Sequence, residues 1–236
     1  MSTSTEQIND LIAGNTALKT FFEGERDALI AAKADLPGLI ARSGVYVDEV
    51  NGLPGNDGSL AQPYDSIDTA LAACRDGQLF EALLLSDCTW STKVSKRGVH
   101  FNVLGWDAGG STTMTRAVTM ANAATNNAND VPGIHILGYG SVQFQSVALT
   151  LSNNDPGITG AQFRCVGFGR IGFVGASIIG TNGTCALLDP YSGGFSLGGA
   201  ALTATDMAGR WVKGVASGVA LNIDHSRGIV GPGFTN

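Results

Sequence analysis

The first forty residues place apolar side chains at the period of an α-helix. Their spacing alternates between three and four residues, as in a helix that packs along one seam against other helices. The seam comprises Ile8, Leu11, Leu18, Phe22, Leu29, Ala32, Leu36 and Leu39. Asn15 and Glu25 are its two polar members. The pattern therefore predicts one helix over residues 5–40, with Thr5 as its N-cap.

A helix of this length would extend about 50 Å at ~1.5 Å per residue, which is too long for one neighbouring domain to cover. Identical chains are the obvious partners, so we predict a self-associating stalk in a parallel homotrimer. A polar seam residue such as Asn15 costs stability but fixes register. The alternative is a helix folded back on its own domain. Gly14 and Gly24 favour it, since each weakens a helix by roughly 1 kcal/mol relative to Ala. Pro37-Gly38 predicts the helix end.

From residue 79 onward the pattern changes to short alternating runs such as GVHFNVLG, separated by clusters of Gly, Asn, Asp, Ser and Pro. This pattern predicts many short strands. A weak repeat, apolar-Gly-aromatic-Asp/Gly, occurs at 104–107, 137–140 and 166–169. In a stacked solenoid, a residue that the turn requires recurs once per coil. We therefore expect stacked β coils in which Trp106, Tyr139 and Phe168 lie above one another, with a change of architecture beyond Ile179.

Between these regions, residues 46–74 read YVDEVNGLPGNDGSLAQPYDSIDTALAAC. A short strand is followed by a loop of turn residues and then by a short amphipathic helix. The apolar face of that helix consists of Ile67, Ala70, Leu71 and Cys74. We predict a capping segment that opens a new domain. The predicted organisation is a helical stalk at 1–40, a joint and cap at 41–78, and a β shaft with a distal tip at 79–236.

This opening segment resembles the one that begins the right-handed parallel β-helix of bacteriophage tail fibres, tailspikes and related pectin-lyase-like proteins. The resemblance implies a mainly β fold, with an N-terminal coiled-coil helix followed by a parallel β-helix-like, Gly-rich β domain in a homotrimer. It also implies a structural virion component that attaches to the host surface and binds other virion proteins through its stalk. A bacterial surface adhesin is an alternative, although MSTSTEQIND lacks the features of a secretory signal.

The amino-acid composition limits the kinds of partner that we expect this protein to bind. Charged residues make up only 14% of the 236 residues, and the formal net charge is −6. No basic stripe indicates a nucleic-acid partner, and no apolar run approaches the ~18 residues of a membrane helix. Cys74, Cys88, Cys165 and Cys185 form no C-x-x-C pair, so we expect small buried side chains. We expect no metal and no cofactor.

A polysaccharide depolymerase is the enzymatic alternative, and it would need two carboxyl groups about 5 to 9.5 Å apart. Residues beyond 98 contain no Glu, and their Asp residues occur mostly in turn contexts, where the side chain normally binds nearby backbone. We therefore expect no catalytic residue. If the protein is an enzyme, Asp189 and Asp206 are the best pair. His100 and His135 occupy similar places in the repeat and predict at most a stacked pair.

A host-surface glycan would be bound by uncharged polar and aromatic side chains. Two regions fit this chemistry: the loop at 108–131 and the distal segment beyond residue 190. The candidate residues are Tyr191, Phe195, Trp211 and Phe234 in the distal segment, and Asn126 and Asn127 in the loop. We favour the distal segment, because the stalk end would be fixed to the particle. The alternative is that these aromatic side chains belong to the core.

Overall fold

The computed structural model describes residues 3–40, 43–121, 131–151, 160–180, 186–192, 194–213 and 228–230. For 10–11, 27–40, 43 and 228–230, the description covers the backbone but not the side chains. The chain divides into two compact units, Met1–Ala41 and Arg42–Asn236.

The first unit is a single helix, α1 (Ser4–Ile40). It begins with a capping box, in which the Glu6 amide donates to Thr3 Oγ1 (3.4 Å) and the Thr3 amide donates to Glu6 Oε2 (2.7 Å). Thr3 is therefore the cap, and the prediction of Thr5 was wrong because Thr5 already lies in the first turn. The helix ends at Ile40, as the predicted range of 5–40 requires, so that bound is confirmed. Only the expected stop at Pro37-Gly38 was wrong, because the helix continues through these two residues.

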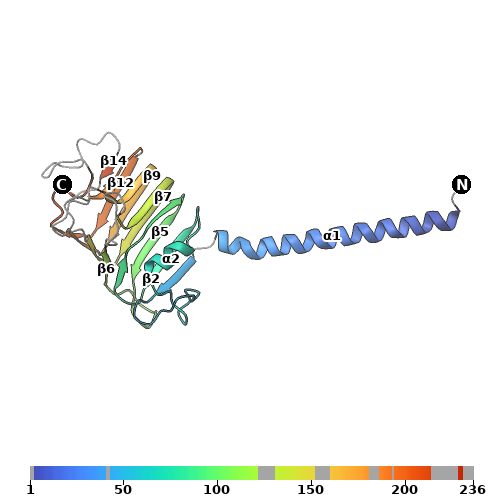
Figure 1. Cartoon of the computed structure of the whole chain (residues 1–236), viewed down its shortest axis with the longest axis horizontal. Coiled ribbons are helices and arrows are strands. Elements are labelled where there is room, and N and C mark those ends of the chain that lie inside the picture. Colours follow the sequence, from blue (N-terminus) through green and yellow to red (C-terminus); the bar gives the residue numbers. More distant parts are fainter. Residues whose placement is uncertain are drawn as a thin grey trace. The chain divides into compact units, whose positions relative to one another are not determined.

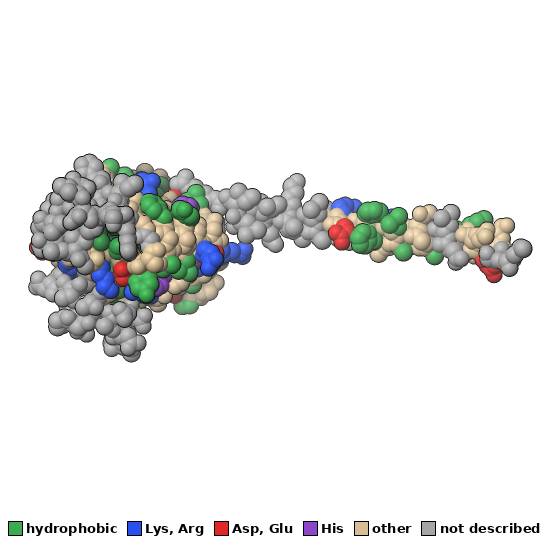
Figure 2. Space-filling model, turned by 90° about the horizontal axis from the view of Figure 1, so that it is seen from above, with side chains coloured by type: hydrophobic (Ala, Val, Ile, Leu, Met, Phe, Trp, Pro, Cys, Tyr) green, Lys and Arg blue, Asp and Glu red, His purple; other side chains and the backbone are tan. Residues whose placement is uncertain are grey.

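Apolar side chains along α1 are exposed to solvent in the single chain. On the predicted seam, Ile8 is 57% exposed, Leu18 53% and Phe22 60%. Figure 2 shows hydrophobic side chains recurring along the described part of this helix. The side chains of Leu11, Leu29 and Leu36 lie outside the described residues. The described part of α1 therefore has a long apolar surface that the helix by itself does not bury.

The second unit contains two β-sheets (Figure 1). The first sheet has the order β1-β2-β5-β7-β9-β12-β14, while β4 pairs with β7 and β11 with β9. Its strands are β1 (Ser43–Val47), β2 (Leu79–Leu84), β4 (Lys93–Arg97), β5 (His100–Gly105), β7 (Gly133–Gln145), β9 (Ala161–Val174), β11 (Ala186–Asp189), β12 (Gly194–Ala200) and β14 (Gly228–Val230). The second sheet has the order β13-β10-β8-β6-β3. Its strands are β3 (Cys88–Trp90), β6 (Arg116–Met120), β8 (Val147–Leu151), β10 (Ser177–Gly180) and β13 (Thr203–Thr205).

Every pairing between these strands is parallel. The chain runs from the first sheet to the second and back, as in β7 to β8 and then β9 to β10. Each passage stacks on the preceding one. The chain is therefore mainly β with parallel sheets, an architecture compatible with a β-helix-like fold.

The first sheet bends where the predicted repeat lies. Gly138 pairs with Gly167 and Tyr139 with Phe168, and the two rings lie 6.5 Å apart. Both glycines have positive φ angles, +74° and +114°, a region that favours glycine. A Cβ atom at Gly167 would also come within 2.3 Å of the Gly138 carbonyl oxygen. The glycines thus permit the bend, and the last two copies of the repeat are confirmed.

Two other expectations about the stack were wrong. Leu104 pairs with Gln145, which places Trp106 outside the Tyr139–Phe168 stack. The coil between β5 and its partner residues on β7 is longer than the coil between β7 and β9. As a result, β5 aligns with the second half of β7 rather than with its bend. The predicted change of architecture beyond Ile179 is also absent from the described residues. There β12 continues the parallel pairing on β9 and β13 continues it on β10.

The core between the sheets is built from aromatic side chains on neighbouring strands. Phe144 and Phe173 stack with ring centroids 5.5 Å apart. Phe80 and Phe101 stack at 5.8 Å. Trp90 of the second sheet meets Phe101 edge-on. Paired aromatic rings add stabilisation beyond the area they bury, so this ladder links successive coils.

The short helix α2 (Ile67–Ala73) begins at the N-cap Ser66, which accepts from the Thr69 amide. The predicted apolar face is confirmed, because its four members are all buried: Ile67, Ala70, Leu71 and Cys74. Asp68 on the same helix accepts hydrogen bonds from the amides and hydroxyls of Ser91 and Thr92, which lie between β3 and β4. These bonds fasten the helix to the first turns of the stack.

Candidate binding site

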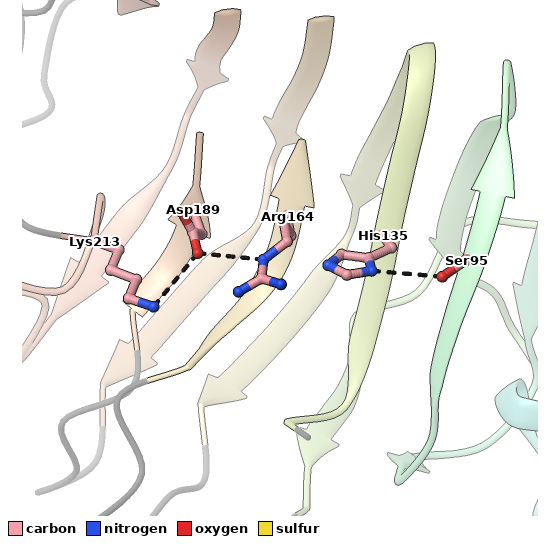
Figure 3. A network of polar contacts seen from close by, with 5 residues as sticks. All are labelled: Ser95, His135, Arg164, Asp189 and Lys213. Carbon is pink, nitrogen blue, oxygen red and sulfur yellow. Dashed lines mark hydrogen bonds and ion pairs between the residues drawn. The ribbon is translucent and has the colours of Figure 1, made fainter. Parts of the chain in front are cut away.

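A row of polar side chains crosses the outer face of the first sheet (Figure 3). Ser95 of β4 pairs with His135 of β7, His135 with Arg164 of β9, and Arg164 with Asp189 of β11. Side chains alternate between the two faces of a strand. Because the apolar residues beside these polar residues point into the core, the polar residues point to the outer face. Lys213 adds one more position, because its amide donates to the Leu188 carbonyl of β11.

Two cations in this row converge on one carboxylate oxygen. Arg164 Nε lies 3.3 Å and Lys213 Nζ 3.5 Å from Asp189 Oδ2. The Asp189 side chain is only 11% exposed, and that of Arg164 is largely buried. Two positive charges against one negative charge leave this group with one net positive charge. Asp189 is the last residue of β11 and binds cations rather than its own backbone, so its predicted role in a turn was wrong.

His135 lies beside this charged group. Its Nδ1 is 3.5 Å from Ser95 Oγ, and its buried Nε2 has no hydrogen-bond partner among the described residues. Burial lowers the pKa of His135, and the nearby cations Lys93 and Arg164 lower it further. A pKa below the ordinary 6.5 keeps the ring neutral at pH 7.

The predicted stacking of His100 on His135 was wrong. Nδ1 of His100 instead lies 2.8 Å from Oγ of Ser141, the residue with which it pairs on β7. The cause is again the longer coil, which brings β5 against the second half of β7.

Tyr191 lies just after β11 and is 64% exposed. Cζ of Arg164 is 4.8 Å from the centre of the Tyr191 ring, a cation–π contact that covers one face of the ring. Of the predicted receptor-binding residues that the structure describes, Tyr191 is therefore at the surface and next to the polar row. Tyr139, at the bend of the same sheet, is 77% exposed.

Two predicted receptor-binding residues are buried instead. Phe195 on β12 belongs to the core, and Trp211 packs edge-on against Phe173 with ring centroids 6.4 Å apart. Burial removes both from surface contact, so the alternative of core aromatics holds for them. Phe234, Asn126 and Asn127 lie outside the described residues.

The carboxyl pair considered for an enzyme does not assemble on one sheet. Asp189 ends β11 of the first sheet, whereas Asp206 follows β13 of the second sheet, exposed and with a φ of 55°. The expected turn role is confirmed for Asp107, whose Oδ1 accepts from the amides of Ser111 and Thr112 at 2.6 Å. These hydrogen bonds lower the pKa of Asp107.

The described cysteines are free and buried, as predicted. Burial raises the pKa of Cys74 to about 11 and those of Cys88 and Cys165 to about 12. Cys185 lies outside the described residues. In the described ranges, no three His, Cys, Asp or Glu side chains group in a way that could hold a metal ion. No helix within those ranges combines the length and apolar character needed to span a membrane.

No protein-family model matches this chain, and comparisons with curated proteins and with solved structures found no match. Of the polar row, the sequence pattern identified only Asp189 and His135, and neither in its actual setting. The 137–140 and 166–169 repeats, extended two residues backwards, would have aligned His135 with Arg164.

Proposed function

We propose that this protein is a fibre or spike component of a phage-like particle that attaches to a glycan on the host surface. Identical chains associate in parallel as a homotrimer through α1, and the stalk also binds other virion proteins. The β unit is a right-handed parallel β-helix that carries the glycan-binding surface. The resemblance of residues 46–74 to the opening of phage fibre domains supports this assignment to virions.

One observation carries the proposal: the exposed apolar seam of α1. Side chains such as Ile8, Leu18 and Phe22 recur at heptad spacing along a helix of 37 residues. Soluble monomers rarely expose large contiguous apolar patches, and a heptad seam is buried by packing against like helices. Parallel β-sheets stacked coil on coil give a shaft whose length grows with each coil, as a fibre requires.

The oligomeric state tests the stalk directly. Light scattering on the full chain should give three times the chain mass of 24.2 kDa. The double variant Ile8→Asp and Phe22→Asp introduces charge into the seam and should give monomers that retain the β-unit circular dichroism. Thr20→Asp is the matched control, because Thr20 is exposed on the helix away from the seam. A parent chain that runs as a monomer would refute the stalk, and a dimer would refute the trimer.

Location on a particle tests the second half of the proposal. Electron microscopy of particles that carry a label at the C-terminus of this protein should place the label at the free end of a fibre or spike. Label on the particle body, or label missing from particles that assemble normally, would contradict the proposed role.

A further inference from the structure

The polar row has the chemistry to select one class of sugar. Asp189 draws Arg164 and Lys213 to a single oxygen atom, which holds two cations close together although they repel each other. One negative charge cannot balance two positive ones. The remaining positive charge lies on a chain with a formal net charge of −6, so it is a local feature that differs from the charge of the chain as a whole.

Asp189 uses only one of the nitrogens of the Arg164 guanidinium group. The ion pair is made through Nε. In Figure 3 the contact to Asp189 ends at Nε, and no contact joins the two terminal nitrogens of the guanidinium to the other labelled residues. The terminal nitrogens of arginine form two parallel hydrogen bonds to a carboxylate. Lys213 can add a charge contact from the side.

Tyr191 supplies a second, apolar element beside these donors. One face of its ring is covered by Arg164, and the side chain remains 64% exposed. An aromatic ring of this kind packs against the apolar face of a sugar ring while its hydroxyl stays in water. A sugar with a carboxylate can therefore place its ring on Tyr191 and its charge at Arg164.

We infer that the outer face formed by Arg164, Tyr191 and Lys213 binds the carboxylate of an acidic sugar within an anionic polysaccharide. Arg164 forms the paired hydrogen bonds, Tyr191 packs on the sugar ring, and Lys213 adds charge. Asp189 is a positioning residue that holds the two cations. This inference rests on the proposed glycan attachment and specifies the sugar that is bound.

The test measures binding of the full chain to pure polymers by isothermal titration calorimetry. Polygalacturonate is the probe, and its methyl ester is the matched ligand because it keeps the sugar and loses the charge. We expect binding to polygalacturonate and at least tenfold weaker binding to the ester, since the ester loses the charge-assisted paired hydrogen bonds to Arg164. Equal affinity for the two polymers would overturn the inference. So would tighter binding of dextran sulfate, which would indicate unspecific charge attraction.

Variants then locate the site. Arg164→Gln should weaken binding about tenfold or more, and Arg164→Lys should recover part of the loss, because charge remains without the paired donors. Arg170→Gln is the matched control, since Arg170 is exposed on the same strand beyond the bend. Tyr191→Ala should weaken binding, whereas Tyr139→Ala should not. Equal losses in the variants and their controls would overturn the assignment.

The melting temperature of each variant separates lost binding from lost folding. Failure of this inference is also distinguishable from failure of the proposed function. A chain that binds host cells and labels fibre ends but ignores acidic polymers contradicts only the inference. A chain that binds polygalacturonate through Arg164 but is missing from particles contradicts only the proposed function.

Discussion

The two units of this chain differ in how far they bury their apolar side chains. Along α1, Phe22 is 60% exposed, whereas Phe144 and Phe173 in the β unit are stacked and buried. A helix satisfies its backbone hydrogen bonds within itself, so it can form while its apolar surface remains uncovered. Parallel strands must find partners far along the chain, and they bury a core as they do so. The β unit therefore buries its aromatic rings within itself, whereas the helix α1 by itself leaves its apolar side chains exposed.

The largest effect is expected from breaking the aromatic ladder of the β unit. Phe144→Ala should lower its free energy of unfolding by about 3–5 kcal/mol, because it leaves a cavity against Phe173. Urea unfolding followed by tryptophan fluorescence measures this loss. Tyr139→Ala on the outer face is the control and should change stability by less than about 0.5 kcal/mol. Because α1 is a separate unit, the Phe144→Ala chain should still self-associate, and loss of self-association would contradict the separation.

The next effect concerns the cap. Asp68→Ala removes four hydrogen bonds to Ser91 and Thr92, and should destabilise the β unit by about 2 kcal/mol. The measurement is the urea midpoint. Asp57→Ala offers the control, since Asp57 is exposed and accepts one amide bond within its own turn. Equal effects of the two changes would mean that α2 does not fasten the stack.

A smaller loss of stability is expected when the N-cap of α1 is removed. Thr3→Ala removes half of the capping box and should cost about 1 kcal/mol of helix stability, seen as a lower melting temperature of the associated stalk. Thr5→Ala tests the rejected cap. It should leave the stalk unchanged or slightly more stable, because alanine is the best helix former and Thr5 lies inside the helix.

The smallest effect involves pH and applies only to the β unit. The folded chain lowers the pKa of His135 through burial and through Lys93 and Arg164. Protons then bind the unfolded chain more readily, so this contribution to stability is present above pH 6.5 and declines as the pH falls below it. His135→Gln should reduce the loss of stability between pH 7 and pH 5. His100→Gln is the matched control and should keep the loss seen in the parent chain.

The sequence pattern predicted the helices and strands better than it predicted which strands lie side by side. The buried face of α2 was predictable because helical spacing alone defines it, and the Gly138–Gly167 bend because only glycine suits its backbone. The polar row was not predictable in the same way. Alternation shows that Arg164 and Asp189 point outward, but not that their strands are adjacent. Which strands are adjacent depends on the lengths of the coils between them. These lengths differ: 40 residues separate Ser95 from His135, 29 separate His135 from Arg164, and 25 separate Arg164 from Asp189.

These unequal coils have a mechanical consequence. If the stack were pulled from its ends, each coil would detach from its neighbour as a unit and release its own length of chain. The coil between Leu79 and His100 spans 21 residues and the one between His100 and Ser141 spans 41, so the two would release about 70 and 140 Å. Parallel strands of one stack would thus yield in steps of different size, and the sequence of steps would identify which coil had opened.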